Sequence, residues 1–426
     1  MVSTTGDHHG HHHRVTSPTP KAWLLNSVLA PHLESYCAHF RRGRYATTTS
    51  VSCVAGLAHF ARWMTQCGLA AEQLDAHKVE QFLNEHLPCC DCPKPVRRNR
   101  GALRAALGHL LAVLLEHGVI HAPPTPTGEI ADELRRYDED MDKSRGLSEG
   151  TRRGALYTVR QLLLHAFAGR PVVIAELKPD DVRKFIAARL DKVGTTSNAI
   201  MLASALRAYF RYRATCGDQV YGLLGVISSP AHWNLASLPQ ALTPDEVARL
   251  LASFNASVPS PKRGYAIVRC ALDLGLRRGE IAKLQLTDID WRNGTVTIKH
   301  TKALHQDTLP LPAVTGQALA DYVRFERPKT TNQAVFVRVL APHDQPISSD
   351  AIHGVIRAAY HRIGLTHGRT HALRHTLACN LVNQGSSLKE VADVLRHRSL
   401  NTSMIYAKLD NSKLAAVALP WPGSTT

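Results

Sequence analysis

The sequence predicts a mainly α-helical protein with one small antiparallel β-sheet, arranged as two helical bundles followed by an α+β domain. Three observations lead to this prediction. One stretch of sequence occurs twice, proline-rich or irregular connectors separate three regions with helical periodicity, and only the third region contains a hairpin signal. A chain of 426 residues is also too long for a single hydrophobic core.

The first 20 residues form a histidine-rich tail. It contains His8, His9, His11, His12 and His13 among glycine, serine and threonine. Low-complexity polar segments of this kind bury too little apolar surface to fold. We expect a disordered tail, native or left from protein expression, without a functional metal site.

The internal repeat defines the two helical bundles. LDAHKVEQFL at 74–83 matches LKPDDVRKFI at 177–186, and each copy lies between longer amphipathic segments. The aligned apolar positions are Leu74, Val79 and Phe82 in the first copy and Leu177, Val182 and Phe185 in the second. The connector APPTPTGE at 122–129 disfavours helix. The predicted domains are therefore 21–121 and 122–235.

Two features of these bundles suggest ligands. The second copy carries basic residues that could line DNA, although each could equally lie on a solvated helix face: Arg152, Arg153, Arg160, Lys184, Arg207, Arg211 and Arg213. The first contains CCDC, with Cys89, Cys90 and Cys92. A structural zinc site needs two spaced ligand pairs, and no second cysteine pair follows. We therefore expect no metal there.

The third domain, 236–426, mixes helices with a small sheet. Thr243, Pro244 and Glu246 form a helix-start signal with a capping box, and Asn293-Gly294 joins two strand-like runs. A second hairpin follows, with Lys302 at its polar tip. Helical periodicity returns from 371 and continues after a second capping box at 387–390.

Composition limits the function. The formal net charge is +16, with basic residues spread along the whole chain, which favours a polyanionic partner such as nucleic acid. The longest apolar stretch is interrupted by Arg104, His109 and Glu116, so it does not predict a membrane span. The N-terminus lacks signal-peptide features, and we expect a cytoplasmic protein whose nine cysteines are thiols.

Two short motifs of the third domain could bind phosphate. In HALRH, His371 and Arg374 are three residues apart and share a helix face. A guanidinium can contact two phosphate oxygens while the imidazole contacts the same group. In GLRRGE, Arg277 stands at a turn with Glu280 one helical turn later, and Arg278 is the obvious competitor.

The stretch LRHRSLNTSMIYAKLD places His397 nine residues before Tyr406. A tyrosine hydroxyl has a pKa near 10, so it can attack only if its proton is removed and the charge of the target phosphate is neutralised. Arginines, histidines and a lysine meet this need. Tyr322 and Tyr360 are alternative tyrosines, and Lys299 is an alternative to Lys302.

Taken in order, these motifs resemble the tyrosine recombinase family, also called the phage integrase family. The matching residues are Arg277, Lys302, His371, Arg374, His397 and Tyr406. The third domain resembles the catalytic domain of this family, and the second repeat resembles its SAM-like core-binding domain. The first repeat resembles the same domain again, an arrangement similar to transposase-like recombinases of mobile elements.

The resemblance assigns roles to the residues around the scissile phosphate. Arg277 and Arg374 would clamp this phosphate and stabilise its pentavalent transition state. His371 would help to accept the tyrosine proton, and Lys302 would protonate the departing 5′ oxygen. Glu280 would orient Arg277 or pack near it.

The resemblance also implies a covalent mechanism. His397 would hydrogen-bond a phosphate oxygen, and Tyr406 would become joined to the 3′ phosphate. The phosphotyrosyl bond conserves the energy of the cut phosphodiester, so resealing needs neither ATP nor a metal. No cofactor is expected.

The implied activity is site-specific recombination of double-stranded DNA, for integration, excision or transposition. We expect a homo-tetramer on DNA, a monomer or dimer in solution, and companion recombinases of the same element as further candidate partners. Alternatives are a type IB topoisomerase and a catalytically decayed DNA-binding accessory protein. Three points stand apart from the family pattern: Arg396 occupies a position where glycine is usual, Lys302 lacks flanking glycines, and His375, next to Arg374, is expected to be structural.

Overall fold

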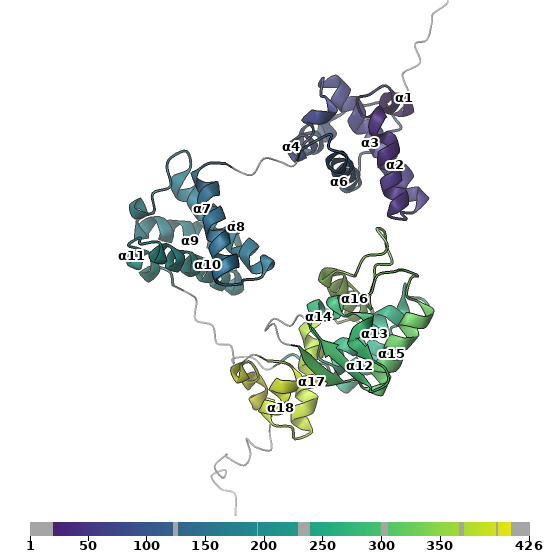
Figure 1. Cartoon of the computed structure of the whole chain (residues 1–426), viewed down its shortest axis with the longest axis vertical. Helices are drawn as coiled ribbons and strands as arrows, with labels where there is room; N and C mark the ends of the chain where they lie inside the picture. The colour runs from purple at the N-terminus through teal and green to yellow at the C-terminus, as the bar shows by residue number, and fades with distance from the viewer. Residues whose placement is uncertain are drawn as a thin grey trace, which may run out of the picture. The chain divides into compact units, whose positions relative to one another are not determined.

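The computed structural model describes residues 20–121, 127–193, 195–228, 239–299, 306–365, 370–397 and 399–409. They divide into two compact units, one within 121–234 and the other made of residues from 1–120 and 235–426. The described part is mainly helical with one small sheet, which confirms the predicted fold class (Figure 1). None of its helices is long and apolar enough to cross a membrane.

The residues of 20–120 form a helical bundle around one hydrophobic core. Helix α3 packs against α1 and α6, and buries Phe60 and Trp63. The elements are α1 (Pro20–Leu25), the 3-10 helix η1 (Ala30–His32), α2 (Leu33–Arg42), α3 (Thr47–Gln66), the 3-10 helix η2 (Ala71–Gln73), α4 (Ala76–Gln81), the π-helix η3 (Phe82–His86), α5 (Leu87–Cys89) and α6 (Arg100–Glu116).

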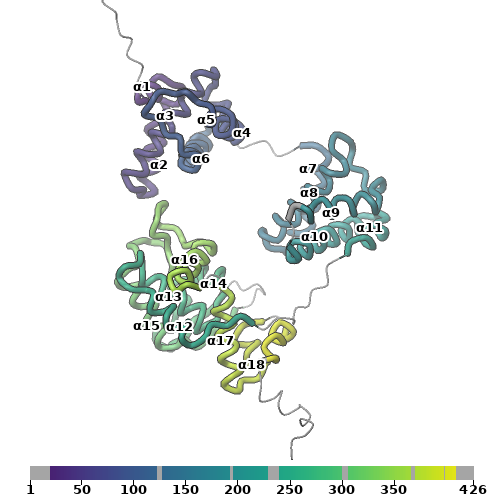
Figure 2. The backbone as a smooth tube through the Cα atoms, turned by 180° about the vertical axis from the view of Figure 1, so that it is seen from behind, coloured from purple at the N-terminus to yellow at the C-terminus, as the bar shows by residue number. Residues whose placement is uncertain are grey.

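The residues of 121–234 form a second bundle with its own core, in which α8 packs between α7 and α10 (Figure 2). The elements are α7 (Glu129–Glu139), the π-helix η4 (Asp140–Ser144), α8 (Glu149–Phe167), the 3-10 helix η5 (Ile174–Glu176), α9 (Pro179–Val193), α10 (Thr196–Thr215) and α11 (Tyr221–Gly225).

The repeat seen in the sequence is confirmed by the two bundles. Each copy directly follows a 3-10 helix, η2 or η5, and leads into an α-helix, α4 or α9. The six aligned apolar residues are all buried in the core of their own bundle. The same pattern therefore places the same apolar positions in a core twice. The three-domain division with bounds near 122 and 236 remains a proposal.

One candidate DNA-lining residue of the second bundle has a structural role instead. Arg213 donates to both carboxylate oxygens of buried Glu133, at 3.0 and 2.9 Å, and to Asp218 at 2.6 Å. Tyr209 donates to the same glutamate at 2.8 Å. Breaking such a buried network would leave a carboxylate unpaired. Arg213 is therefore held by the interior of its own bundle, with 16% of its side chain exposed, rather than on a solvated helix face.

The residues of 239–409 hold the sheet. Its order is β1-β2-β3, antiparallel throughout, with Asp290 opposite Thr295 and Thr297 opposite Thr308. The elements are α12 (Pro244–Ala252), α13 (Pro261–Asp273), α14 (Arg278–Lys283), the 3-10 helix η6 (Leu286–Asp288), β1 (Ile289–Asp290), β2 (Thr295–Ile298), β3 (Asp307–Pro310), α15 (Ala313–Phe325), α16 (Ser349–Arg362), α17 (Thr370–Asn383), α18 (Leu388–Val394) and the 3-10 helices η7 (Leu400–Thr402) and η8 (Met404–Leu409).

The local signals of this region form as predicted. Thr243 and Glu246 make the capping box of α12, and Ser387 with Glu390 makes that of α18. Both hairpins form, the first through Asn293-Gly294. The tip of the second, with Lys302, lies outside the described residues. Helix α13 packs against α15, α16 and α17, which brings its C-terminal end next to the segments that carry the candidate site.

Candidate active site

A left-handed turn at the end of α13 presents Arg277. Gly275 has φ +58°, and a Cβ there would lie 2.9 Å from a Leu395 methyl and 3.0 Å from a Leu377 methyl. Both the backbone angle and the close packing therefore require glycine. Arg277 precedes α14 and donates from Nη1 to Oε1 of Glu280 at 2.7 Å, while its backbone N–H donates to Oε2 at 2.9 Å.

Arg396 completes an ion-pair network on the other side of Glu280. Its side chain is only 3% exposed, and Nη2 donates to Oε2 of Glu280 at 3.0 Å. Burial alone would raise the pKa of Glu280, but the charges and hydrogen bonds of Arg396 and Arg277 lower it below the usual value. The carboxylate therefore stays ionised between the two guanidinium groups.

Arg396 also explains the departure from the family pattern. Its φ is +54°, in the left-handed region that glycine adopts without strain. This chain keeps the backbone geometry of a glycine but adds a side chain, which turns inward to Glu280 and to the carbonyl of Val394, at 3.0 Å. The strain is offset by a buried ion pair.

Arg374 lies on α17 and is buried against the same turn. Its two Nη atoms donate to the backbone carbonyls of Gly275 and Leu395. Burial, with the adjacent charges of Arg277 and Arg396, lowers the pKa of Arg374 to about 9, so the group is still protonated at pH 7. The fold thus gathers three positive charges around one carboxylate, which leaves a net positive site.

Tyr406 lies on η8 with its side chain against α17. The residue is 2% exposed, and its hydroxyl is 2.8 Å from Nδ1 of His375. Burial raises the pKa of Tyr406 to about 12, although the charge of Arg374 acts in the opposite direction. Burial, with the charges of His371 and Arg374, lowers the pKa of His375, which favours a neutral imidazole. A neutral imidazole can accept the tyrosine proton.

His397 follows the Arg396 turn and is half-buried. Its Nδ1 is 2.7 Å from the hydroxyl of Ser403, which is fully buried. Burial, followed by the charges of Arg374 and Arg277, lowers the pKa of His397 to about 4, so the ring is neutral at pH 7. With the serine donating to Nδ1, the proton of the ring would be on Nε2, which could then donate to an anion.

The remaining predicted residues are His371 and Lys302. His371 is exposed on the first turn of α17, and the charge of His371 contributes to the lowered pKa of His375. Lys302 lies outside the described residues. Its alternative, Lys299, is paired with the buried Asp288, at 2.5 Å.

The alternative arginine and the two alternative tyrosines lie outside this cluster. Arg278 pairs with Asp350 on the surface, at 3.1 Å, with 49% of its side chain exposed against 23% for Arg277. Tyr322 and Tyr360 are buried in the hydrophobic core around α13, α15 and α16. The structure therefore brings together Arg277, Arg374, His397 and Tyr406, and not the alternative residues Arg278, Tyr322 and Tyr360.

Two residues of the cluster were not assigned by the sequence. His375 looked structural because it directly follows Arg374, and no pattern indicates which histidine of HALRH meets the tyrosine. Arg396 was noted only as a departure from glycine. Its inward pairing with Glu280 joins residues that are far apart in the chain, and local sequence carries no signal for such a contact.

The comparisons with known proteins place this arrangement in a family. The model of the phage integrase family matches residues 240–413, and the model of the phage integrase N-terminal SAM-like domain matches 134–215. A putative integrase/recombinase of Sinorhizobium fredii, y4rA, is 31% identical over 391 residues, which cover 89% of this chain and 91% of that protein. The chain belongs to the phage integrase family. The family resemblance of the sequence is thereby confirmed.

Solved structures of recombinases share the fold of this family member. XerH site-specific recombinase, in a post-cleavage complex with a palindromic difH substrate, is 18% identical, with a TM-score of 0.53, covering 73% of this chain and 93% of that one. A lambda integrase tetramer bound to a Holliday junction is 17% identical, with a TM-score of 0.50, covering 71% and 89%.

We expect Arg396→Gly to destabilise this integrase-family protein. Removing one partner of a buried ion pair costs about 3–5 kcal/mol. Relief of left-handed strain returns about 1–2 kcal/mol, and Glu280 keeps Arg277, so the net loss in the free energy of unfolding is roughly 2 kcal/mol. Urea unfolding of the full-length protein measures it.

Arg278→Ala is the matched control for this variant. It removes a neighbouring arginine whose pair is exposed, so its effect should stay within about 1 kcal/mol. If Arg396→Gly unfolds at the same urea concentration as the wild type, or at a higher one, the pair with Glu280 does not stabilise the site.

Proposed function

We propose that this protein is a site-specific DNA recombinase that cuts and rejoins DNA through a covalent 3′-phosphotyrosyl intermediate, and that it integrates, excises or transposes a mobile element. One observation carries the proposal. The tyrosine hydroxyl of Tyr406 meets the imidazole of His375 beside Arg374, in a site that also contains Arg277 and His397. A nucleophile, a proton acceptor and a positive anion site thus lie together.

The proposed binding site for the scissile phosphate lies among Arg277, Arg374 and His397. Each Nη of Arg374 carries a second N–H beyond the one given to a backbone carbonyl, so the group can be fixed by the fold and still donate to a phosphate. Its position is set before DNA arrives. Donors fixed in advance stabilise developing charge without reorganisation during the reaction.

In the proposed reaction, the oxygen of Tyr406 attacks the phosphorus of the scissile phosphodiester. The bond from oxygen to phosphorus forms, and the bond from phosphorus to the 5′ oxygen breaks. The tyrosine proton passes to a histidine, His375 at 2.8 Å or His371 as the resemblance implies. The 5′ oxygen takes a proton from Lys302. The products are a 3′-phosphotyrosine and a 5′ hydroxyl, and reversal with another 5′ hydroxyl rejoins the strand.

This chemistry requires neither ATP nor a metal ion. The phosphotyrosyl ester retains the free energy of the phosphodiester bond, so the free-energy change of rejoining is close to zero. In metal-dependent nucleases, a metal ion neutralises negative charge on the phosphate. In the proposed reaction, the two arginines that clamp the phosphate neutralise this charge. We assign the lysine role to Lys302 because Lys299 already pairs with buried Asp288.

The proposed partner is double-stranded DNA, bound by a homo-tetramer. The charge of +16 favours a polyanion. The lambda integrase of similar fold is a tetramer on a Holliday junction, XerH is bound to its difH substrate, and y4rA is named an integrase/recombinase. Companion recombinases of the same element would be further partners.

A plasmid recombination assay tests the function. The substrate carries two copies of DNA taken from the ends of the element that contains the gene. Recombinant circles are expected from this plasmid and not from one that lacks the ends. Relaxation of any supercoiled plasmid without recombinants would contradict the proposal and favour a type IB topoisomerase. Specific binding without cutting would favour an accessory protein.

A further inference from the structure

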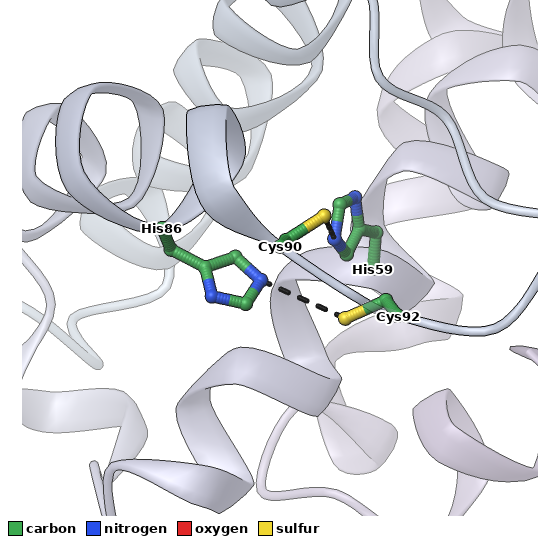
Figure 3. A group of neighbouring side chains, drawn as sticks. All are labelled: His59, His86, Cys90 and Cys92. Atoms are coloured by element: carbon green, nitrogen blue, oxygen red, sulfur yellow. Dashed lines mark hydrogen bonds between the residues drawn. The ribbon is translucent and has the colours of Figure 1, made fainter.

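Four potential metal ligands meet inside the first helical bundle, and none of them belongs to the candidate active site. They are His59, His86, Cys90 and Cys92, and their ligand atoms all lie within 4.8 Å of one another (Figure 3). His59 comes from the middle of α3, His86 ends the π-helix η3, and the two cysteines follow α5. From these residues we propose a structural zinc site of the Cys2His2 type.

Two sulfur-to-nitrogen distances fit a tetrahedral ion. Sγ of Cys90 is 3.5 Å from Nε2 of His59, and Sγ of Cys92 is 3.7 Å from Nε2 of His86. Zinc binds sulfur and nitrogen at about 2.0–2.3 Å, so two ligand atoms of one tetrahedral ion lie roughly 3.3–3.8 Å apart. Both pairs fall in this interval. A thiol is also a weak hydrogen-bond donor. These contacts alone therefore give little reason for two thiols and two imidazoles to lie together.

The surroundings orient the ligands as a metal site requires. Nδ1 of His59 is 2.8 Å from the carbonyl of Arg97, which leaves Nε2 directed at the cysteines. Metal-binding histidines almost always make this kind of contact with their second nitrogen. His86 stacks on Phe82, with the ring centroids 5.4 Å apart, so its direction is fixed as well. The π-helix that ends at His86 is a rare form that is frequent at functional sites.

The charge and burial of the site favour a closed structural role. His59, Cys90 and Cys92 are buried, and His86 is partly buried. Two thiolates and two neutral imidazoles balance the charge of one divalent ion, and four protein ligands leave no position open for a substrate. Two sulfurs and two nitrogens in a tetrahedron select zinc over harder cations.

Zinc would add cross-links to a part of the bundle that has no regular secondary structure. The segment between Cys90 and Asn99 has no helix or strand, yet it connects α5 to α6. On binding, two bonds from sulfur to zinc form, and two thiol protons pass to the solvent. The ion would then tie this segment to α3. The sequence-based expectation of no metal considered cysteine pairs only, and the second pair consists of histidines from two other elements.

Cobalt binding to the full-length, reduced protein tests the site. Co²⁺ replaces zinc and gives a thiolate-to-cobalt charge-transfer band together with intense visible bands of tetrahedral geometry. The histidine-rich tail has no thiolates, so it cannot produce the first signal. We expect saturation at one cobalt per chain and reversal by zinc. Absence of the charge-transfer band in the wild type overturns the proposal.

Cysteine variants locate the ligands. Cys92→Ser and Cys90→Ser should lose the charge-transfer signal and retain one zinc less per chain than the wild type. Cys89→Ser is the matched control, because Cys89 belongs to the same CCDC motif but is exposed and outside the cluster. A chelator should lower the Tm of the wild type and of Cys89→Ser, but not that of Cys92→Ser. Equal zinc content in Cys89→Ser and Cys92→Ser overturns the assignment.

Discussion

Tyr406→Phe is expected to abolish the covalent protein–DNA adduct while leaving DNA binding unchanged. The substitution removes the hydroxyl proposed to attack phosphorus and keeps the ring that packs beside α17. It also removes the hydrogen bond to His375, which contributes about 1 kcal/mol to stability. Denaturing gel electrophoresis measures the adduct, and a gel-shift titration measures binding.

Tyr322→Phe is the control for this experiment. Tyr322 is equally buried, lies in the other core of the same region, and loses only a long contact from the backbone N–H of Val337, at 3.4 Å. Its adduct yield should match that of the wild type. If Tyr406→Phe still forms an adduct, another residue is the nucleophile and the assignment of Tyr406 is wrong.

Arg277→Ala is expected to lower the rate of DNA cleavage by about 10²–10³-fold, the effect of removing one preorganised donor to a transition-state oxygen. Glu280 keeps its partner Arg396, so the buried carboxylate is not left unpaired and the fold is retained. Single-turnover cleavage of a nicked site, with the protein in excess, separates this rate from binding and product release.

The neighbouring arginine provides a sharp control. Arg278→Ala removes an equal charge from the next residue, but Arg278 lies on the surface and pairs with the exposed Asp350. Its cleavage rate should remain within a few-fold of the wild type when both proteins are saturated with DNA. Equal losses in the two variants would mean that the cleavage rate depends on the local positive charge in general, and that Arg277 has no specific place in the transition state.

Local signals in the sequence predicted much of the fold. The capping boxes at Thr243 and Ser387 and the hairpin at Asn293-Gly294 form where the sequence places them. Each depends on residues that are neighbours in the chain, so the spacing alone carries the information. The repeat was readable for the same reason, since its buried positions follow helical periodicity.

The contacts that connect distant segments were not predictable in this way. Arg396 reaches Glu280 from a distant part of the chain. The positive φ of residue 396 explains why glycine is usual at this position, and it is seen only in the structure. Cys90 and Cys92 appeared to lack partners because His59 and His86 reach them from other elements. In both cases the tertiary structure, and not the motif, brings the groups together.

The most direct measurement is the identity of the residue that becomes attached to DNA. The protein is incubated with a nicked substrate that traps the cleaved state, the adduct is isolated in detergent, and its peptides are identified by mass spectrometry. A nucleotide is expected on the peptide that contains Tyr406, joined through the 3′ phosphate. Attachment at any other residue, attachment through a 5′ phosphate, or the absence of an adduct on DNA that the protein binds specifically would contradict the proposed mechanism.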